Sequence, residues 1–213
     1  MTDTVVVVTG GEPVLPGALA GLPADAYVVA ADGGIAHALG LGLRVDEAVG
    51  DFDSATPGQI DAVARAGGRI VRHPVAKDAT DLELALGVAL AARPARIVVL
   101  GGHGGRFDHW LANGLLLAAP AYAGVRLQAR MGVATLTVVR RPTVLRGEPG
   151  ELVSLLPVHG TAFAVRTDGL RYPLCAEDLP AGTSRGVSNA FLGTEATVSL
   201  AAGVLLAVQP GVP

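Results

Sequence analysis

The first half of the chain alternates short runs of β-branched residues with stretches of helical periodicity. Uninterrupted apolar runs such as Val5–Val8 and Tyr27–Ala31 are typical of strands buried on both faces of a sheet. Strands are expected at 5–8, 27–31, 45–49, 69–71 and 96–100, and helices at 35–41, 57–66, 81–92 and 107–119. A capping box, Thr80-Asp81-Leu82-Glu83, opens the third of these helices. Strands that alternate with helices predict a parallel sheet with right-handed crossovers.

After Pro120 the pattern changes, because no long helical period follows. Short β-rich runs punctuated by Gly, Pro and Asp are expected to form strands at 125–129, 134–139, 151–156, 161–166, 194–200 and 204–208. The last two are predicted to pair as a closing hairpin that turns at Ala202-Gly203. The expected fold class is therefore an N-terminal Rossmann-like parallel α/β domain, residues 1–125, followed by a C-terminal antiparallel β-sandwich or barrel domain, residues 126–213.

Composition narrows the range of partners. Of the 213 residues only 16% are charged, and the net charge of -3 with a pI near 5.9 leaves no basic footprint for nucleic acid or an anionic membrane. The single cysteine, Cys175, cannot form an internal disulfide, so a cytoplasmic protein is expected; its side chain is predicted to be a small buried one. Met1-Thr2-Asp3-Thr4 has no signal-peptide pattern, and polar residues interrupt the uncharged tail Ala196–Pro213. The sequence predicts a soluble protein.

Polar clusters follow three of the predicted strands. Asp32-Gly33-Gly34 follows the second, Asp51 and Asp53 follow the third, and Gly101–Arg106 follows the strand that ends at Leu100. Any one cluster alone is most simply turn chemistry, since Asp and Gly are common in turns. Ligands bind outside the carboxyl ends of strands in an open parallel sheet, so three clusters at equivalent ends favour a ligand site.

Four carboxylates fall into two tight pairs in this charge-poor chain. Asp51 and Asp53, two apart, would project to one face of an extended segment, and Asp78 and Asp81 lie three apart at a helix start. Such acids repel one another unless a cation lies between them. Mg²⁺ with a polyphosphate is the expected occupant, since Mg²⁺ is held by carboxylates and substrate phosphates. Lys77 either binds a phosphate as a point charge or forms a surface salt bridge.

The glycine loop at 101–105 can cradle an anion with its amides, although no P-loop Gly-Lys-Ser/Thr follows it. Arg106, Asp108, His109 and Asn113 crowd the start of the next helix with hydrogen-bonding groups. His109 is either a base, a ligand or a hydrogen-bonded structural residue. The other histidines lack metal-ligand spacing and are interpreted as incidental: His37, His73, His103 and His159.

The ordered motifs of the chain resemble those of the thiamine pyrophosphokinase family. The resemblance lies in Ala31–Gly34, Gly50–Ser54, Lys77–Asp81, Gly105–Asn113, Ser154–Pro157, Thr167–Leu174 and Gly186–Phe191, and it spans nearly the whole chain in the right order. It implies a nucleotide-binding catalytic domain at 1–125 and a thiamine-binding domain at 126–213. It also implies transfer of pyrophosphate from ATP to the thiamine hydroxyl with release of AMP, in a homodimer whose site lies near the subunit interface.

The resemblance also assigns roles to residues of this chain. It implies a Mg²⁺ cofactor held by Asp51, Asp53 and Asp81, the last also a candidate base for the hydroxyl proton. Lys77 joins these three acids as a catalytic residue. ATP and phosphate binding is expected of Asp32, Gly33, Gly34, Asp78, Thr80, Arg106, Asp108, His109 and Asn113, and thiamine binding of Tyr172, Ser188 and Asn189.

Two departures from the family pattern keep alternatives open. Ala190 stands where the family usually has a glutamate, and the chain is poor in the aromatic residues expected around thiamine rings. Tyr172 is the best stacking candidate, since Trp110 is expected in the core of the first domain. A pyrophosphokinase with another alcohol acceptor, or a non-catalytic nucleotide- or thiamine-binding module, is the alternative. A plain NAD-binding domain is disfavoured because no G-x-G-x-x-G follows the first strand.

Overall fold

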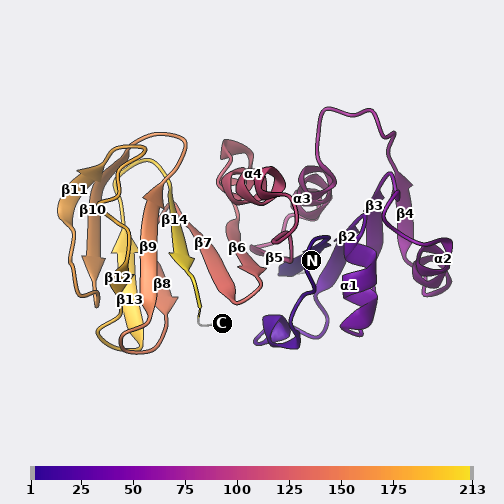
Figure 1. Cartoon of the computed structure of the whole chain (residues 1–213), viewed down its shortest axis with the longest axis horizontal. Coiled ribbons are helices and arrows are strands. Elements are labelled where there is room, and N and C mark those ends of the chain that lie inside the picture. Colours follow the sequence, from indigo (N-terminus) through magenta and orange to yellow (C-terminus); the bar gives the residue numbers. More distant parts are fainter. Residues whose placement is uncertain (1–2, 212–213) are drawn as a thin grey trace. The chain divides into compact units, whose positions relative to one another are not determined.

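The computed structural model describes residues 3–211 of the chain (Figure 1). The residues Met1-Thr2 of the predicted amino terminus and Val212-Pro213 of the predicted tail lie outside the described part. The chain divides into two compact units. The first comprises Met1–Leu116 with Gly124–Gly132, and the second comprises Leu117–Ala123 with Val133–Pro213.

The first unit is built on a parallel sheet with the strand order β6-β5-β1-β2-β3-β4. Its strands are β1 (Thr4–Thr9), β2 (Tyr27–Ala31), β3 (Glu47–Gly50), β4 (Arg69–Arg72), β5 (Arg96–Leu100) and β6 (Arg126–Met131). Its helices are η1 (Pro16–Leu19), α1 (Gly34–Gly40), α2 (Pro57–Arg65), α3 (Asp81–Ala91) and α4 (Phe107–Leu117), whereas η2 (Pro120–Tyr122) belongs to the second unit. The chain runs outward from β1 to β4 and returns on the other side of β1 as β5. This reversal makes the carboxyl ends of β1 and β5 the expected ligand crevice.

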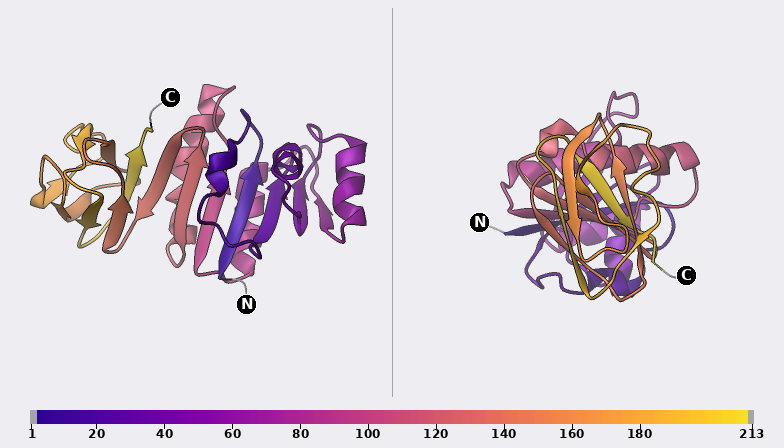
Figure 2. Two further views of the ribbon diagram at one scale, coloured as in Figure 1. Left: turned by 90° about the horizontal axis from the view of Figure 1, so that it is seen from below. Right: turned by 90° about the vertical axis from the view of Figure 1, so that its left-hand side faces the viewer.

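Strand β1, at the centre of this sheet, buries all six of its residues, because both faces of the sheet are covered. Val6 and Val8 pack in one cluster with Ile35 of α1. Successive side chains of a strand point to opposite faces, so Val5 and Val7 face the other way. Helix α3 contacts β1, β2 and β3. The left view of Figure 2 shows the strands of this sheet side by side.

The β6 strand corrects one prediction, because residues 125–129 were expected in the antiparallel half of the chain. The strand pairs in parallel with β5. Its alternating burial, with Leu127, Ala129 and Met131 buried, resembles that of an antiparallel strand. The polar side chains between them are engaged, however, since Arg130 donates to the carbonyls of Ala18 and Ala20 at 2.6 and 2.8 Å.

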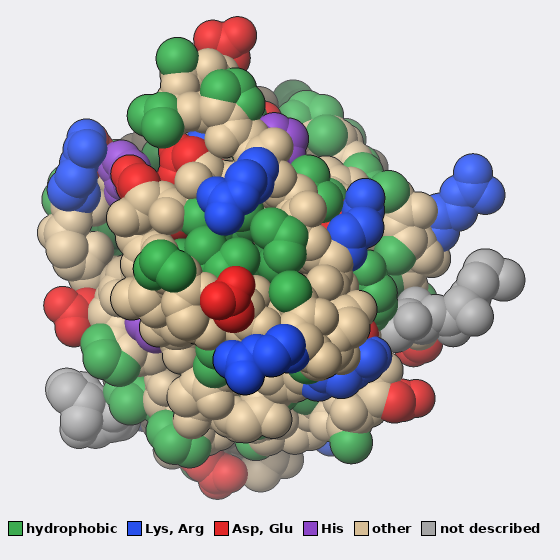
Figure 3. Space-filling view, turned by 90° about the vertical axis from the view of Figure 1, so that its right-hand side faces the viewer, with side chains coloured by type: hydrophobic (Ala, Val, Ile, Leu, Met, Phe, Trp, Pro, Cys, Tyr) green, Lys and Arg blue, Asp and Glu red, His purple; other side chains and the backbone are tan. Residues whose placement is uncertain are grey.

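The opposite edge of the sheet, β4, carries charge. Arg69 and Arg72 at its two ends are exposed. Figure 3 shows the face on this side, where basic and acidic side chains surround a small hydrophobic patch. Charged side chains on an edge strand discourage pairing with another strand.

Local capping explains where two helices begin. The Thr80 hydroxyl accepts from the Glu83 amide at 3.2 Å at the start of α3, as one half of the predicted box requires. A reciprocal capping box forms at α2, where Thr56 and Gln59 each bind the other's backbone N–H. Capping fixes the entry of α3, and therefore the position of Asp81 in its first turn.

The strands of the second unit pair antiparallel in two sets, β12-β9-β14-β7, which is part of a ten-stranded sheet, and β11-β10-β13-β8, which is a four-stranded sheet of its own. The strands are β7 (Ala134–Val139), β8 (Thr143–Arg146), β9 (Leu152–Pro157), β10 (Ala162–Asp168), β11 (Cys175–Leu179), β12 (Asn189–Ala190), β13 (Glu195–Ser199) and β14 (Leu205–Gln209). One apolar cluster draws on both sheets, with Val139 and Leu205 from the first and Val165 and Val198 from the second. The sequence did not predict β8, β11 or β12.

The predicted closing hairpin of the tail is wrong. Strand β13 pairs with β8 and β10, whereas β14 pairs with β7 and β9 in the other sheet. Between them, Ala201 and Ala202 exchange backbone hydrogen bonds with Phe163, which carries the chain from one sheet to the other. In the described part of the chain no helix has the length and hydropathy needed to cross a membrane.

The predicted burial of Cys175 is also wrong, because its side chain is exposed. Cys175 begins β11, an edge strand with only Leu179 buried among its five residues.

Candidate active site

A pocket of about 590 Å³ opens at the carboxyl ends of the parallel strands. The loops after β1, β2, β3 and β5 line it together with the first turns of α3 and α4. Predicted site residues on its wall are Asp32, Gly33, Asp51, Asp53, Thr80, Asp81, Arg106, His109 and Asn113. Gly34, Lys77, Asp78 and Asp108 are not among the lining residues.

Two glycines permit the close approaches on which the pocket depends. A Cβ on Gly34 would lie 2.2 Å from the Val8 carbonyl oxygen, so only glycine lets α1 start directly against β1. Gly50 has a φ of +152° and lies between two acids. A Cβ there would come within 3.1 Å of both Asp32 Cβ and Asp81 Oδ1. A side chain at position 50 would therefore separate the two carboxylates.

An acidic triad forms where β2 and β3 end. One carboxylate oxygen from each of Asp32, Asp51 and Asp53 lies within 4.8 Å of the other two. The segment is not extended as predicted, because Phe52 has a φ of 62° and buries its ring. Asp51 Oδ1 instead accepts from the Asp53 amide at 3.3 Å in a tight turn. The two acids still share one side, by a route the sequence did not predict.

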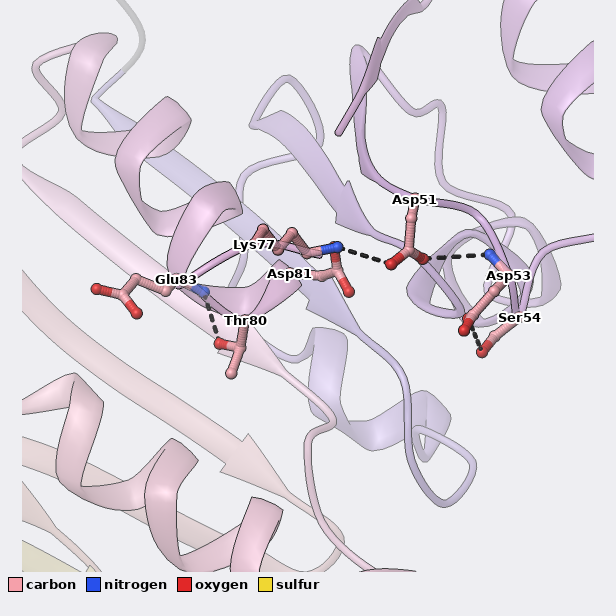
Figure 4. A network of polar contacts seen from close by, with 7 residues as sticks. All are labelled: Asp51, Asp53, Ser54, Lys77, Thr80, Asp81 and Glu83. Carbon is pink, nitrogen blue, oxygen red and sulfur yellow. Dashed lines mark hydrogen bonds and ion pairs between the residues drawn. The ribbon is translucent and has the colours of Figure 1, made fainter. Parts of the chain in front are cut away.

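Lys77 joins the triad to α3. Its ammonium donates to Asp51 Oδ2 at 2.8 Å and lies 2.9 Å from Asp81 Oδ1 (Figure 4). Asp81 Oδ1 is buried, and this ion pair with Lys77 is its close contact with a cation. The side chains of Lys77 and Asp51 are only 13% and 10% exposed. Lys77 therefore forms the ion pairs that the salt-bridge interpretation expected, although its side chain is not at the surface, and its phosphate role stays a prediction.

The charges of this cluster shift its acid–base equilibria. The hydrogen bond from Lys77 holds the pKa of Asp51 below its ordinary value, against a smaller opposing effect of burial. Burial by itself lowers the pKa of Lys77, but its contacts with Asp51 and Asp81 outweigh burial and raise it. Lys77 and Asp51 are thus both charged at neutral pH.

Asp32 differs from its neighbours. Burial raises its pKa, with hydrogen bonds from Gly33 and Ser54 opposing that effect. Its Oδ1 atom is buried without a partner among the described residues. A buried acceptor with no donor costs free energy unless a cation or a proton reaches it. The orphaned oxygen, the all-oxygen triad and the neighbouring acids fit a hard divalent cation.

Arg106 lines the pocket and pairs at 2.5 and 3.1 Å with Asp108 at an exposed position. The guanidinium lowers the pKa of Asp108 to about 2. Asn113 donates to the Gly102 carbonyl at 3.0 Å, so its amide orders the glycine loop. His109 is exposed on the pocket wall, where α4 begins.

Two histidines interpreted as incidental also line this pocket, together with Thr9, Gly10 and Gly11. His37 lies with Nδ1 3.1 Å from the Thr9 carbonyl, so Nδ1 carries the proton. His103 is partly buried with Nδ1 unpartnered in the described structure, and burial lowers its pKa. The pair Gly10-Gly11 directly after the first strand was the available signal for this side of the pocket.

The three predicted thiamine residues lie in the second unit. Asn189 is 5% exposed, and its side chain makes two hydrogen bonds with the backbone of Tyr172. It accepts from the Tyr172 amide at 3.0 Å and donates to the Tyr172 carbonyl at 2.7 Å. The Tyr172 side chain is 54% exposed. Ser188 adopts a φ of 57°, and its amide donates to Ser154 Oγ at 3.1 Å.

A parallel α/β sheet whose carboxyl edge gathers acids, a lysine paired with two of them and a glycine loop is typical of enzymes that transfer phosphate groups. Comparison with known proteins gives the particular family. Residues 22–129 match the family profile described as thiamin pyrophosphokinase, catalytic domain, and residues 141–205 match that family's vitamin B1 binding domain. The chain belongs to the thiamin pyrophosphokinase family, whose members are kinase-type transferases.

Relatives agree along the whole chain. The thiamine pyrophosphokinase of Bacillus subtilis (strain 168) is 29% identical, over 97% of this chain and 98% of its own. A solved thiamin pyrophosphokinase from Geobacillus thermodenitrificans is 26% identical over 99% of this chain and 98% of its own, with a TM-score of 0.81. A family protein from Enterococcus faecalis is 27% identical over the full length of both chains, with a TM-score of 0.80.

Proposed function

We propose that the protein transfers the pyrophosphate group of ATP to the hydroxyl of thiamine, giving thiamine diphosphate and AMP. The observation that carries this proposal is the acidic triad of Asp32, Asp51 and Asp53, linked through Lys77 to Asp81 in one pocket. A chain that only bound a nucleotide would have little reason to concentrate carboxylates beside phosphates of the same sign. The family membership of both halves supports the same reaction.

Asp51 and Asp53, with Asp32 or Asp81, would hold Mg²⁺ together with the phosphates, directly or through water. The bound ion would neutralise charge that develops on the phosphate oxygens. Phosphoryl-type transfer asks mainly for positioning and charge neutralisation, so no covalent enzyme intermediate is required. Lys77 and Arg106 are the cations of this chain that would assist. Gly33, Gly34, Asp78, Thr80, Asp108, His109 and Asn113 would shape the ATP site.

In the transfer step the thiamine hydroxyl oxygen bonds to the β-phosphorus as the bond from that phosphorus to the α–β bridging oxygen breaks. The electron pair of that bond leaves with AMP. The hydroxyl proton passes to a carboxylate, and Asp81 is our assignment. Its Oδ1 is held by Lys77, which fixes the carboxylate in one orientation.

We assign the thiamine end to Tyr172, Ser188 and Asn189. The polar atoms of Asn189 are occupied by the Tyr172 backbone, so Asn189 is a positioning residue. It presents an exposed phenol ring that can stack on an aromatic ligand. Ala190 is buried and offers no polar side-chain contact where the family usually has a glutamate.

The proposal extends to the finer architecture. We assign a Rossmann-like nucleotide domain to residues 1–125 together with β6, and a thiamine-binding β-sandwich to the remainder of the predicted domain at 126–213. The apolar cluster shared by the two antiparallel sheets supports the sandwich. A cytoplasmic setting agrees with the single cysteine.

We also propose a homodimer, supported by α4. Only Leu117 of this helix is buried, and the expected core position of Trp110 is wrong, since that side chain is 40% exposed. Phe107 and Leu111 are 69% and 48% exposed, on the same stretch of helix. An exposed apolar helix face is typical of a surface that another protein covers. Leu111→Asp should shift the molar mass in light scattering from dimer to monomer; an unchanged dimer would contradict this use of α4.

The test of function is incubation with ATP, Mg²⁺ and thiamine, followed by chromatography of nucleotides and thiamine esters. AMP and thiamine diphosphate should form in equal amounts, and Asp51→Asn should reduce turnover by about 10²-fold or more. Asp61→Asn is the matched control, because that acid lies exposed on α2 outside the pocket; its turnover should be unchanged. AMP formed only with another alcohol would replace thiamine as the acceptor, and absence of both products would favour a binding module.

A further inference from the structure

Lys77 is less exposed than the basic residues of the other ion pairs in the described structure. Its segment, between β4 and α3, is otherwise open, with Val75, Ala76 and Asp78 exposed. The Lys77 side chain turns inward, to 13% exposure, between Asp51 and Asp81. An ordinary surface ion pair would keep the ammonium in water.

Asp51 is shared between two positions that suit positive charge. Its Oδ2 accepts from the Lys77 ammonium, and one of its oxygens also belongs to the triad with Asp32 and Asp53. A carboxylate that serves two neighbouring cations is the arrangement of two-metal phosphate-transfer sites. In this chain one of the two positions is already filled by an ammonium group.

We propose that Lys77 replaces a second divalent ion. The wild-type chain then binds one divalent cation at Asp32, Asp51 and Asp53, while the ammonium neutralises Asp51 and Asp81 from the other side. This inference rests on the proposed function, because it assumes that the acidic triad is the metal site of the pyrophosphate transfer. Removal of the ammonium opens a second cation site between Asp51 and Asp81.

Two features of the cluster support this assignment. Asp81 Oδ1 is buried and its one close cation is the Lys77 ammonium at 2.9 Å, so removal of the ammonium leaves that oxygen available to a different cation. Asp32 Oδ1 has no hydrogen-bond partner in the described structure. The triad is therefore the position at which the first ion would bind. Lysine provides a compact charge on a flexible stem, whereas a divalent ion would need several oxygen ligands at fixed angles.

The test counts Mn²⁺ bound per full-length chain, from the free-ion signal in electron paramagnetic resonance, without nucleotide. We expect one ion for the wild type, two for Lys77→Met, and one for Lys77→Arg, which keeps the charge. Arg106→Met is the matched control, since it removes a cation that lines the pocket and frees only the single acid Asp108. It should still bind one ion.

The double variant Lys77→Met with Asp81→Asn should return to one ion, since it removes a ligand of the new site. If Lys77→Met does not fold without metal, Lys77→Gln takes its place, and its melting temperature should rise with Mn²⁺ more than that of the wild type. A count of one ion in Lys77→Met, or in Lys77→Gln where that variant takes its place, would overturn the proposal. Two ions in the wild type or in Arg106→Met would overturn it as well. The Mn²⁺ count involves no acceptor alcohol. A failure to make thiamine diphosphate would therefore contradict the proposed function without changing the expected number of bound ions.

Discussion

Asn189 gives the sharpest link between a single side chain and the stability of the second unit. Its side chain makes three hydrogen bonds at a position that is 5% exposed. The Oδ1 atom accepts from the amides of Tyr172 and Ala190 at 3.0 and 2.9 Å, and Nδ2 donates to the Tyr172 carbonyl at 2.7 Å. Asn189→Ala removes all three bonds and leaves three backbone groups without these partners.

Each such hydrogen bond contributes about 1 kcal/mol net, so the free energy of unfolding should fall by about 3 kcal/mol. For a chain of this size that corresponds to a drop of about 6–12 °C in the melting temperature. Urea denaturation followed by far-ultraviolet circular dichroism measures the change. Asn113→Ala is the matched control with one hydrogen bond, to Gly102, and should cost about 1 kcal/mol.

The reasoning is refuted if Asn189→Ala costs no more than Asn113→Ala. A second readout separates folding from binding. At a temperature where the variant is folded, its KM for thiamine should rise while its KM for ATP stays near the wild-type value, because Asn189 positions Tyr172 and no residue of the first unit. Equal changes in both constants would contradict the positioning role.

Three further predictions follow from local geometry. Gly34→Ala should lower the free energy of unfolding by about 3 kcal/mol or more in urea denaturation, because its Cβ would lie 2.2 Å from the Val8 carbonyl oxygen. The control is Gly87→Ala in α3, which has open space around it and should raise the free energy of unfolding by about 0.5–1 kcal/mol. Thr56→Ala should cost about 1 kcal/mol by the same measurement, through loss of the capping box, and no change would discount that cap. Lys77 lowers the pKa of Asp51, so their pair stabilises the fold above the ordinary Asp pKa of about 4 and is lost as pH falls through the lowered value. The difference in unfolding free energy between wild type and Lys77→Met should therefore shrink in acid; a constant difference would show that the pair does not titrate with folding.

Much of the parallel sheet could be predicted because its strands are buried on both faces. The runs that became β1, β2 and β5 have no competing pattern, and their predicted positions agree with the structure to within a residue or so. Strand β11 was missed for the opposite reason. Its sequence Cys-Ala-Glu-Asp-Leu lies at a sheet edge and buries only Leu179, so its hydrophobic pattern is too weak to read.

The pairing of strands was harder to predict than their existence. The tail contains two strand-length arms, and a local hairpin is their simplest pairing. The long-range ladders of β13 with β8 and of β14 with β7 replace it, because together they enclose the shared apolar cluster. Such ladders join residues far apart in sequence and leave no local signal.

The site follows the same division between local and long-range information. Acids close in sequence, such as Asp51 and Asp53, could be grouped from spacing alone. Asp32 joins them because β2 and β3 are neighbours in the sheet. His103 lies within the predicted glycine loop, but its side chain was interpreted as incidental because it lacks metal-ligand spacing; its place on the pocket wall follows from a long-range contact in which the Glu12 amide donates to its carbonyl at 2.9 Å.

The most direct test of the central claim follows the phosphorus atoms of ATP. With thiamine, Mg²⁺ and ATP labelled with ³²P at the β position, we predict that the label passes to thiamine diphosphate and that AMP is the only nucleotide product. Label at the α position should stay in AMP. Formation of ADP together with thiamine monophosphate, or β label retained on the nucleotide, would contradict pyrophosphate transfer by this site.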